Sequence, residues 1–595
     1  MIRVRNLEVW IVGLALLLAS CDTAQPPAPV TNVNTQAVSC APWNASEAYV
    51  KGDTVTYEGA TYRANWWTQG DNPAANSGPE GSGQPWTRVA DGCNATPPPP
   101  APGGIACFFE HANYGGASFC ADSDSSWVGS AWNDRISSVK VRSGYQVQLF
   151  GDVNYSGAVK TLTGDASSLP GFNDQASSFK VAKTTVTPLP NTGGYKRVGY
   201  FVQWGIYARN FKMVDMDRSG AAATLTHLNY AFGGITPEGT CTVTAPGISD
   251  SFADYTKAFA AGESVDGVGD TWDQKLRGNF NQIKELKAKH PGLKVLISLG
   301  GWTWSKNFSD VALTDASRKK FVSSCIDIYI KGNLPSADGA GGPGTGVGVF
   351  DGIDVDWEYP ASEGNAGNVV RPEDTRNFTL LLEELRRQLG AAGTGKLLTA
   401  ALPSAPAKVA KLEVASISRS LDLMNVMTYD FRGGWNVTGP TNFHSNLYPD
   451  PASPGSAEER TWSVDTAINA YLQAGAPAKK LIVGVPYYGR GWRGVGGANS
   501  GLYQNATGLP QGRYEAGIDN YNVLVGKPGT VYRSAVTKQL WKFDGNEFWS
   551  YDDPEVLTAK MNYIKQKGLG GSMAWSMDGE DANASLSKAV YNGLK

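Results

Sequence analysis

Basic clusters and histidine are both scarce in this 595-residue chain. The formal net charge is −3, and no block of lysine and arginine interrupts the sequence. A nucleic-acid partner would normally need a basic face, so the charge pattern argues against this class of protein. The four histidines, His111, His227, His290 and His444, are scattered along the chain. Their spacing offers no zinc constellation.

The chain also lacks an apolar run long enough to stay in a bilayer. Arg3 and Arg5 are followed by an apolar stretch at residues 9–19, which is too short for a permanent membrane helix. We therefore interpret residues 1–21 as a signal peptide. The run Leu18-Ala-Ser-Cys21 resembles a bacterial lipobox, which implies that Cys21 is lipidated in the mature protein. Ordinary cleavage near a chance cysteine is the alternative.

Cysteine is rare as well, with seven residues in the chain. Export implies an oxidising compartment, and six of the cysteines fall as two in each of three later parts of the sequence. The predicted disulfides therefore join Cys40 to Cys93, Cys107 to Cys120, and Cys241 to Cys325. Cys21 is left over, which agrees with a lipid attachment site.

The length predicts several modules, because single hydrophobic cores stop growing near about 250–300 residues. Stretches rich in proline, serine, threonine and asparagine at residues 23–39, 94–104 and 183–194 indicate linkers. We predict modules at residues 40–93, 105–182 and 195–595. The glycine-rich run at 339–348 precedes a predicted strand rather than a helix, so it is not a phosphate-binding loop.

The first module has short alternating runs at residues 54–57 and 61–64, which predict a small all-β unit. Its sequence includes Tyr49-Val-Lys-Gly-Asp53, Ala64-Asn-Trp-Trp-Thr-Gln-Gly70 and Pro85-Trp86. This pattern closely resembles the family 5 and 12 chitin-binding modules. The resemblance implies that exposed tryptophans stack on N-acetylglucosamine units, with Trp66, Trp67 and Trp86 as candidates. Adjacent strand residues face opposite ways, so at least one of Trp66 and Trp67 is expected in the core.

The second module contains an internal repeat of about 40 residues. Phe109-Glu-His-Ala-Asn-Tyr114 matches Phe150-Gly-Asp-Val-Asn-Tyr155, and Asn133-Asp-Arg-Ile-Ser-Ser138 matches Asn173-Asp-Gln-Ala-Ser-Ser178. Two tandem copies of one β unit predict two packed Greek keys. The module resembles microbial βγ-crystallin domains.

That resemblance implies calcium binding by the paired stretches, because hard oxygen donors suit Ca²⁺. The ligand residues carried over by the motif are Asn133, Asp134, Ser137, Asn173, Asp174 and Ser177. The alternative is that these side chains only cap turns.

The third module alternates apolar β runs with helical stretches. The predicted strands cover residues 198–204, 227–232, 294–299, 347–356, 397–402, 422–428, 480–486 and 571–575. Eight such units predict an α/β fold, a closed (β/α)₈ TIM barrel preceded by the two small all-β modules. In such barrels the active site lies at the C-terminal ends of the strands.

The fourth predicted strand places acids on one face. Val347, Val349, Ile353, Val355 and Trp357 alternate with polar positions and should pack against the helices. The remaining positions include the carboxylates Asp354, Asp356 and Glu358, which would point inward at steps of about 7 Å. Like charges this close cannot all ionise freely, so one proton is retained near neutral pH. A carboxyl that holds a proton can act as a general acid.

The run Asp351-Gly-Ile-Asp-Val-Asp-Trp-Glu358 resembles the signature of family 18 glycoside hydrolases. Other motifs agree: Ser298-Leu-Gly-Gly301, Met427-Thr-Tyr-Asp430, Gly484-Val-Pro-Tyr-Tyr-Gly-Arg490 and Trp575. The resemblance covers the whole module and is closest to bacterial chitinases, which carry an α+β insertion, here at about residues 491–551.

The resemblance assigns roles to individual residues. Glu358 would protonate the glycosidic oxygen, Asp356 would hold the substrate acetamide N–H, Asp354 would tune Asp356, and Tyr429 would contact the acetamide oxygen. The expected substrate-binding residues are Trp204, Trp302, Met427, Asp430, Arg490 and Trp575. A structural role remains the alternative for the tryptophans.

The sequence thus predicts an exported, monomeric chitinase that acts on chitin and chitooligosaccharides with retention. Hydrolysis is expected to need no metal or cofactor, and membrane contact would come only through the lipid anchor. Two alternatives stay open. One is a chitin-binding protein without activity, and the other is a hydrolase of a related glycan such as an N-glycan core or peptidoglycan.

Overall fold

The computed structural model describes residues 41–45, 48–49, 53–58, 60–66, 68–78, 84–89, 104–142, 145–162, 164–183, 189 and 193–595. The chain divides into two compact units, residues 1–102 and 103–595, and each is described by itself. Several predicted features lie outside the described residues, namely the signal peptide with Cys21, the pair Cys40 and Cys93, and Trp67.

The first unit contains a four-stranded sheet in the order β1-β3-β4-β6, together with the pair β2 and β5. The strands are β1 (Ala41–Pro42), β2 (Ala48–Tyr49), β3 (Thr54–Tyr57), β4 (Ala60–Ala64), β5 (Thr68–Gln69) and β6 (Trp86–Val89). The two alternating runs predicted from the sequence form the antiparallel pair β3 and β4. Their inward side chains Val55, Tyr62 and Ala64 form the core with Tyr49 and Trp86.

The tryptophans of this unit differ in exposure. Trp66 is 44% exposed, whereas Trp86 is fully buried. The Trp86 indole N–H donates to the Asp71 carbonyl at 2.9 Å, and its ring packs against Tyr49 with the centroids 5.3 Å apart. The prediction that Trp86 belongs to an exposed platform is therefore wrong, because its polar edge has a partner inside the core.

Residues 104–183 form two three-stranded sheets, β8-β7-β9 and β11-β10-β12. Their strands are β7 (Ala106–His111), β8 (Gly115–Ala121), β9 (Ser138–Val141), β10 (Tyr145–Asp152), β11 (Ser156–Leu162) and β12 (Ser178–Lys183). The turns repeat closely, since Asn113 and Asn154 both adopt φ 57°. Asparagine tolerates this left-handed conformation better than most residues. Phe108, Leu149 and Phe179 are among the residues that share one core between the two sheets.

The third part of the chain is a closed barrel of eight parallel strands. Its strands are β13 (Lys196–Val202), β14 (His227–Ile235), β16 (Lys294–Gly300), β19 (Gly352–Asp356), β20 (Leu397–Leu402), β21 (Leu423–Val426), β22 (Leu481–Pro486) and β28 (Gly571–Trp575). They pair in chain order, and β28 pairs with β13 to close the barrel. The predicted TIM barrel is confirmed. β14 and β22 are buried along their whole length because helices and barrel interior cover both faces.

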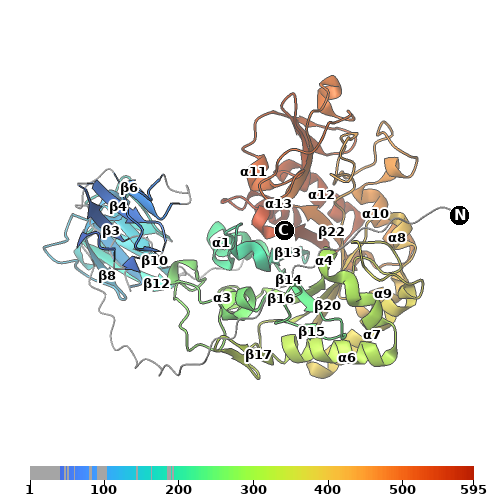
Figure 1. The fold of residues 1–595 in the computed structure, drawn as a ribbon, viewed down its shortest axis with the longest axis horizontal. Coiled ribbons are helices and arrows are strands. Elements are labelled where there is room, and N and C mark those ends of the chain that lie inside the picture. The colour runs from blue at the N-terminus through green and yellow to red at the C-terminus, as the bar shows by residue number, and fades with distance from the viewer. Residues whose placement is uncertain are drawn as a thin grey trace, which may run out of the picture. The chain divides into compact units, whose positions relative to one another are not determined.

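Helices surround these strands, as Figure 1 shows for α3, α6, α7, α9 and α12. The main ones are α1 (Met213–Ser219), α3 (Gly278–Lys289), α6 (Asp315–Cys325), α7 (Asp374–Ala392), α9 (Val414–Ser420), α10 (Val464–Gln473), α12 (Pro554–Lys567) and α13 (Ser585–Leu594). The shorter ones are α2 (Ala221–Thr224), α4 (Gly301–Trp304), α5 (Phe308–Ala312), α8 (Pro406–Val409) and α11 (Tyr521–Leu524). Helix α12 shows how local sequence sets the bounds of a helix. Asp553 caps its first amide groups, and Gly568 ends it in the left-handed conformation.

The strand that carries the acids is shorter than predicted. β19 begins at Gly352, and Val347 is 54% exposed in the loop that precedes the strand. Gly344 and Gly348 adopt φ 73° and 82°, which only glycine adopts readily, so the backbone cannot stay extended there. The predicted helix-facing position of Val347 is therefore wrong. Val349, Ile353, Val355 and Trp357 do lie in the main core, as predicted.

An insertion follows β22, where a five-stranded antiparallel sheet has the order β24-β23-β27-β26-β25. Its strands are β23 (Tyr488–Trp492), β24 (Ile518–Asn520), β25 (Thr530–Arg533), β26 (Leu540–Phe543) and β27 (Phe548–Tyr551). Two disulfides are present as predicted, Cys107–Cys120 and Cys241–Cys325. Among the described residues, none of the helices has the length and apolar character needed to cross a bilayer.

Candidate active site

The acids Asp354, Asp356 and Glu358 follow one another along β19 and its C-terminal end. The alternate residues Val355 and Trp357 pack outward, and Trp357 stacks on Phe308 with the centroids 5.3 Å apart. This parity turns the three acids towards the barrel interior. All three are buried, at 0%, 4% and 8% exposure in chain order.

Asp354 is fully supplied with hydrogen bonds from four neighbouring strands. Tyr200 of β13 and Ser298 of β16 donate to Oδ2 at 2.6 and 2.7 Å. The hydroxyl of Thr399 on β20 and the amide of Asn425 on β21 donate to Oδ1. Burial raises the pKa of Asp354, and these four donors work against that rise because they favour the charged form.

Asp356 has a different environment, although it is only two residues away. Its Oδ1 atom is buried and has no hydrogen-bond partner in the structure. Burial raises the pKa of Asp356 well above its ordinary value, and the charges of Glu358 and Asp354 raise it further. A buried carboxylate oxygen without a donor is costly. Asp356 can therefore accept a hydrogen bond from a group that enters the cleft.

The backbone of Glu358 is fixed on both sides. Its N–H donates to Ser305 Oγ at 2.9 Å, and its carbonyl accepts from Asn368 Nδ2 at 2.9 Å. Burial raises the pKa of the Glu358 carboxyl to about 7, and the charge of Asp430 adds to the rise. The Tyr359 hydroxyl and the Lys408 ammonium act in the opposite direction. A carboxyl with a pKa near 7 can deliver a proton at neutral pH.

Two glycines explain why the motif Ser298-Leu-Gly-Gly301 has its sequence. A side chain at Gly300 would meet the Asp356 carbonyl at 2.4 Å, and one at Gly301 would meet the Phe232 ring at 2.4 Å. Both residues also adopt positive φ, 101° and 75°. Glycine is required here because the backbone passes close to the acid strand.

Asp430 and Arg490 form an ion pair at the edge of the acids. Arg490 Nε and a terminal nitrogen donate to the two oxygens of Asp430 at 2.8 and 2.7 Å. The Tyr488 hydroxyl donates to the same carboxylate at 2.7 Å. Although burial opposes it, the Arg490 charge holds the pKa of Asp430 well below its ordinary value. Asp430 therefore stays charged and cannot act as a proton donor.

A cleft of about 970 Å³ lies above these groups and is lined by aromatic residues. It contains nearly all the predicted site residues: Trp204, Trp302, Asp356, Glu358, Met427, Tyr429, Asp430, Arg490 and Trp575. Asp354 lies behind them, out of the lining. Tyr429 is almost buried, and its hydroxyl lies 3.8 Å from Met573 Sδ, so its oxygen has no strong partner there.

The floor of the cleft is a stack of three rings. Phe232 lies 5.7 Å from Trp575 and nearly parallel to it, at an interplanar angle of 23°. Phe232 is the middle ring. Trp204 lies beside it, with the ring centroids 6.1 Å apart and an interplanar angle of 31°. Trp302, by contrast, is 51% exposed at the rim. Flat apolar faces of this kind suit the faces of sugar rings.

Several lining residues were not predicted from the sequence: Phe232, Trp304, Tyr359, Lys408, Trp435 and Trp462. Trp435 directly follows the glycine pair Gly433-Gly434, as the predicted Trp302 follows Gly300-Gly301, and that pattern could have suggested it. Lys408 had no such signal, because it comes from the short helix α8 and reaches the Tyr359 ring at 3.5 Å. No group of three or more His, Cys, Asp or Glu side chains suited to a metal occurs among the described residues.

The barrel, the proton-bearing acid and the ring-lined cleft together define a hydrolase of glycosidic bonds. The comparison with protein families agrees, because residues 196–580 match the model described as "Glycosyl hydrolases family 18". The chain belongs to this family. Residues 42–87 match "Carbohydrate-binding module family 5/12". Residues 94–162 match "Peptidase inhibitor family I36", where the sequence had suggested a βγ-crystallin domain.

Known proteins with similar sequences include bacterial chitinases. Chitinase 63 of Streptomyces plicatus is 34% identical, over 94% of this chain and 91% of its own length. Chitinase C of Streptomyces lividans is 40% identical over 66% of this chain, which spans 59% of that protein. Among solved structures, the catalytic domain of psychrophilic chitinase B from Arthrobacter TAD20 has 45% identity and a TM-score of 0.65. The match covers 68% of this chain and 97% of that domain.

The raised pKa of Glu358 predicts a pH-dependent stability. The folded state holds this proton more tightly than the unfolded state. The proton's contribution to the stability of the fold is therefore complete below about pH 4.5 and is lost as the pH rises through about 7. Glu358→Gln cannot ionise, so it does not lose stability over this pH range. We expect its melting temperature to match wild type near pH 4 and to exceed it by a few degrees at pH 8, measured by calorimetry. Glu515→Gln, at an exposed position of the same cleft, is the control and should show no such gain. An equal gain for Glu358→Gln at both pH values would contradict the account.

Proposed function

We propose that the chain is a chitinase that cleaves β-1,4 linkages between N-acetylglucosamine units with retention. The observation that carries this proposal is the pairing of Glu358, whose pKa burial raises to about 7, with a buried, unpartnered Oδ1 on Asp356. A substrate with an amide N–H beside the scissile bond supplies the donor that Asp356 lacks. The N-acetyl group of N-acetylglucosamine is such a donor.

The reaction follows from these positions. Glu358 protonates the glycosidic oxygen as the bond to the sugar C1 breaks, and the substrate's acetamide oxygen attacks C1. Asp356 accepts the acetamide N–H and balances the positive charge of the oxazolinium ring. The Tyr429 hydroxyl contacts the acetamide oxygen. Glu358, now charged, then takes a proton from the water that opens the ring, which restores the starting state.

The substrate acts as the nucleophile because no second acid is free to attack the sugar from the side opposite Glu358. Asp356 ends the strand that leads to Glu358 and shares its face, so it lies on the same side of the sugar as Glu358. A conventional retaining pair needs a carboxylate free to attack from the opposite side of the sugar. Both oxygens of Asp430 are held by Arg490, and Asp354 is enclosed by four donors behind the cleft. The Trp204, Phe232 and Trp575 rings would support the sugar at the cleavage point.

Two assays with the purified protein test this function. Wild type should release product from chitin oligosaccharides, whereas Glu358→Gln should lose at least about a thousandfold in kcat/KM because the proton donor is gone. Oligosaccharides of deacetylated glucosamine should resist cleavage by wild type. Cleavage of the deacetylated substrate at a similar rate would contradict the acetamide mechanism. An inactive wild type would favour the alternative of a binding protein, and a preference for N-glycans would favour the alternative of another glycan hydrolase.

The first module fits attachment to the same polymer. Trp66 is exposed, which leaves its ring available for stacking on chitin, although Trp86 is not. Chitin is insoluble and cannot enter a cell, so we infer that the protein acts outside the cytoplasm. A monomer is sufficient for this activity, since the described barrel provides every proposed catalytic group.

We also propose that the repeated module is βγ-crystallin-like and binds calcium. The stretches at residues 133–138 and 173–178 are hydrogen-bonded to each other. The Asp134 N–H donates to the Ala176 carbonyl at 3.3 Å, and the Asp174 N–H donates to the Ile136 carbonyl at 3.1 Å. Ser137 Oγ lies 2.8 Å from Asp174 Oδ1 of the other stretch. Oxygen donors from both repeats thus meet, which fits Ca²⁺. The residues that would hold it are Asn133, Asp134, Ser137, Asn173, Asp174 and Ser177.

Calorimetric titration of the full-length protein tests this binding. Calcium should give binding heat and raise the melting temperature of the module, because a ligand that binds only the folded state stabilises it. Asp174→Ala should remove a large part of both effects, while Asp122→Ala, an exposed acid outside the two stretches, should not. Absence of calcium-linked heat in wild type would overturn the proposal.

The N-terminal segment supports a further proposal, that Cys21 carries a lipid which anchors the protein to the bacterial cell surface. Metabolic labelling with a palmitate analogue tests it. Wild type should take up the label and Cys21→Ala should not. Label that persists in Cys21→Ala, or wild type without label, would refute the anchor.

A further inference from the structure

A buried polar network lies behind the two rings that begin the floor of the cleft. Gln203 directly precedes Trp204, and its side-chain oxygen accepts the backbone N–H of Phe232 at 3.1 Å. The Gln203 side chain thus links the backbone at Phe232 to the residue that precedes Trp204. Neither Gln203 nor its other partners line the cleft, whereas Trp204 and Phe232 do.

The centre of the network is Asp254, on the short helix η4 (Phe252–Thr256) between β14 and α3. Asp254 Oδ1 accepts from Gln203 Nε2 at 3.0 Å and from the Tyr230 hydroxyl at 2.6 Å. Asn279 of α3 donates to the Tyr230 hydroxyl at 3.1 Å. These four side chains are 0–2% exposed, so no solvent competes for their hydrogen bonds.

The direction of these hydrogen bonds fixes the orientation of the Gln203 amide. Asp254 Oδ1 accepts from both Gln203 and Tyr230, so it takes the NH₂ end of the Gln203 amide. The oxygen end of the amide then faces Phe232 and accepts its N–H. Without this partner the amide could turn over, and a donor would face the Phe232 N–H.

The directions of the hydrogen bonds suit a role in positioning. Burial raises the pKa of Asp254 well above its ordinary value, so burial disfavours the charged form of this carboxyl. Apolar residues of similar size often fill buried polar positions without loss of stability. Here the polar side chains instead form hydrogen bonds of fixed direction, which hold the backbone at Phe232 and the residue before Trp204.

We propose that Asp254 is a positioning residue that, through Gln203, sets the sugar-stacking rings Trp204 and Phe232 in the floor of the cleft. This inference rests on the proposed function, because it assumes that the rings support a sugar. Asp254 touches no substrate itself. Its loss should weaken the binding of the oligosaccharide and leave the proton transfer by Glu358 unchanged.

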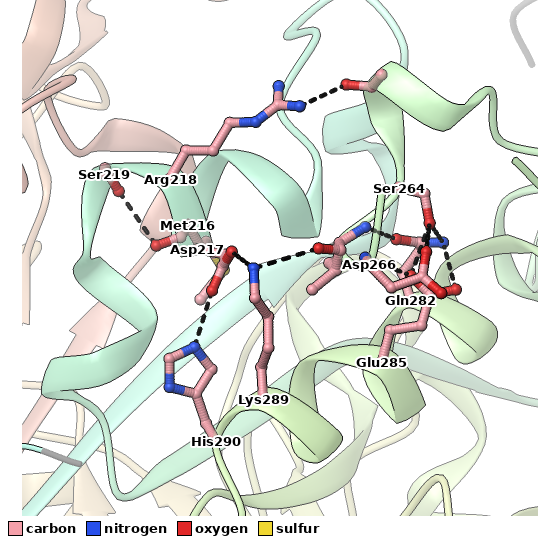
Figure 2. Close-up of polar contacts among 12 residues, drawn as sticks. Met216, Asp217, Arg218, Ser219, Ser264, Asp266, Gln282, Glu285, Lys289 and His290 are labelled. Atoms are coloured by element: carbon pink, nitrogen blue, oxygen red, sulfur yellow. Dashed lines mark hydrogen bonds and ion pairs between the residues drawn. The ribbon is translucent and has the colours of Figure 1, made fainter. Parts of the chain in front are cut away.

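The opposite end of α3 offers a matched control. Figure 2 shows Lys289 and His290, at the end of this helix, with Asp217 of α1 as their common partner. The same view shows Glu285 and Gln282 of α3 with Ser264. The Asp217 side chain is 7% exposed and connects α1 to the end of α3, but no hydrogen bond or ion pair among the described residues joins it to Gln203, Trp204 or Phe232.

The test compares three variants of the full-length enzyme on chitin oligosaccharides. Asp254→Leu removes the oxygen that accepts from Gln203 and Tyr230, and should raise KM by about tenfold with the pH profile of kcat unchanged. Asp254→Asn keeps an amide oxygen that can take the place of Oδ1 and accept the same two hydrogen bonds. This conservative variant should therefore keep KM within about twofold of wild type.

Asp217→Leu should lower the melting temperature as Asp254→Leu does, but leave KM unchanged. The inference is overturned if Asp254→Leu leaves KM at the wild-type value, if Asp254→Asn raises KM as much as Asp254→Leu does, or if Asp217→Leu raises KM to the same extent. A wild type that cleaves no chitin oligosaccharide would overturn the proposed function and this inference with it. An active wild type with an unaffected Asp254→Leu variant would overturn the inference alone.

Discussion

The removal of three carboxylates from water along one strand is the constraint on which the site depends. A β-strand turns every second side chain to the same face, so Asp354, Asp356 and Glu358 must share the interior of the barrel. Burial favours the neutral form of each, and at Asp356 the charges of Glu358 and Asp354 add to that effect. The surrounding strands provide a different number of hydrogen-bond donors to each acid, and each acid therefore has a different role. Asp354 receives four donors, Asp356 keeps an oxygen without a donor, and Glu358 has a pKa of about 7.

The rest of the barrel serves this arrangement. Four different strands supply the donors of Asp354, which only a closed barrel brings around one side chain. Gly300 and Gly301 let a neighbouring strand end pass close to the acids. Arg490, from the inserted sheet, neutralises Asp430 at the edge of the cleft and so removes it from the proton chemistry. The aromatic floor completes a site in which the substrate brings both the missing donor and the nucleophile.

Much of this could be predicted from the sequence where a residue's neighbours are fixed by local periodicity. The bounds of β20 and β28 match the predicted ranges 397–402 and 571–575, because apolar strands covered on both faces end where polar residues begin. The start of β19 was predicted wrongly, since Val347 is apolar but lies among glycines with positive φ. Trp86 was misplaced because the sequence does not show which side of a small sheet finds a partner for an indole N–H. Lys408 and Asp254 could not be predicted, because only the tertiary fold brings α8 and η4 to the cleft and to Gln203.

The central claim is that the pKa of Glu358 is raised to near neutral, and an NMR titration of carboxyl carbons observes this most directly. The spectra of wild type and Glu358→Gln, with ¹³C label in the glutamate side chains, should differ by one resonance. The account predicts that this resonance titrates near pH 7, because burial and the charge of Asp430 raise the pKa of Glu358. A resonance that titrates near pH 4.5, as an ordinary glutamate does, would contradict the account.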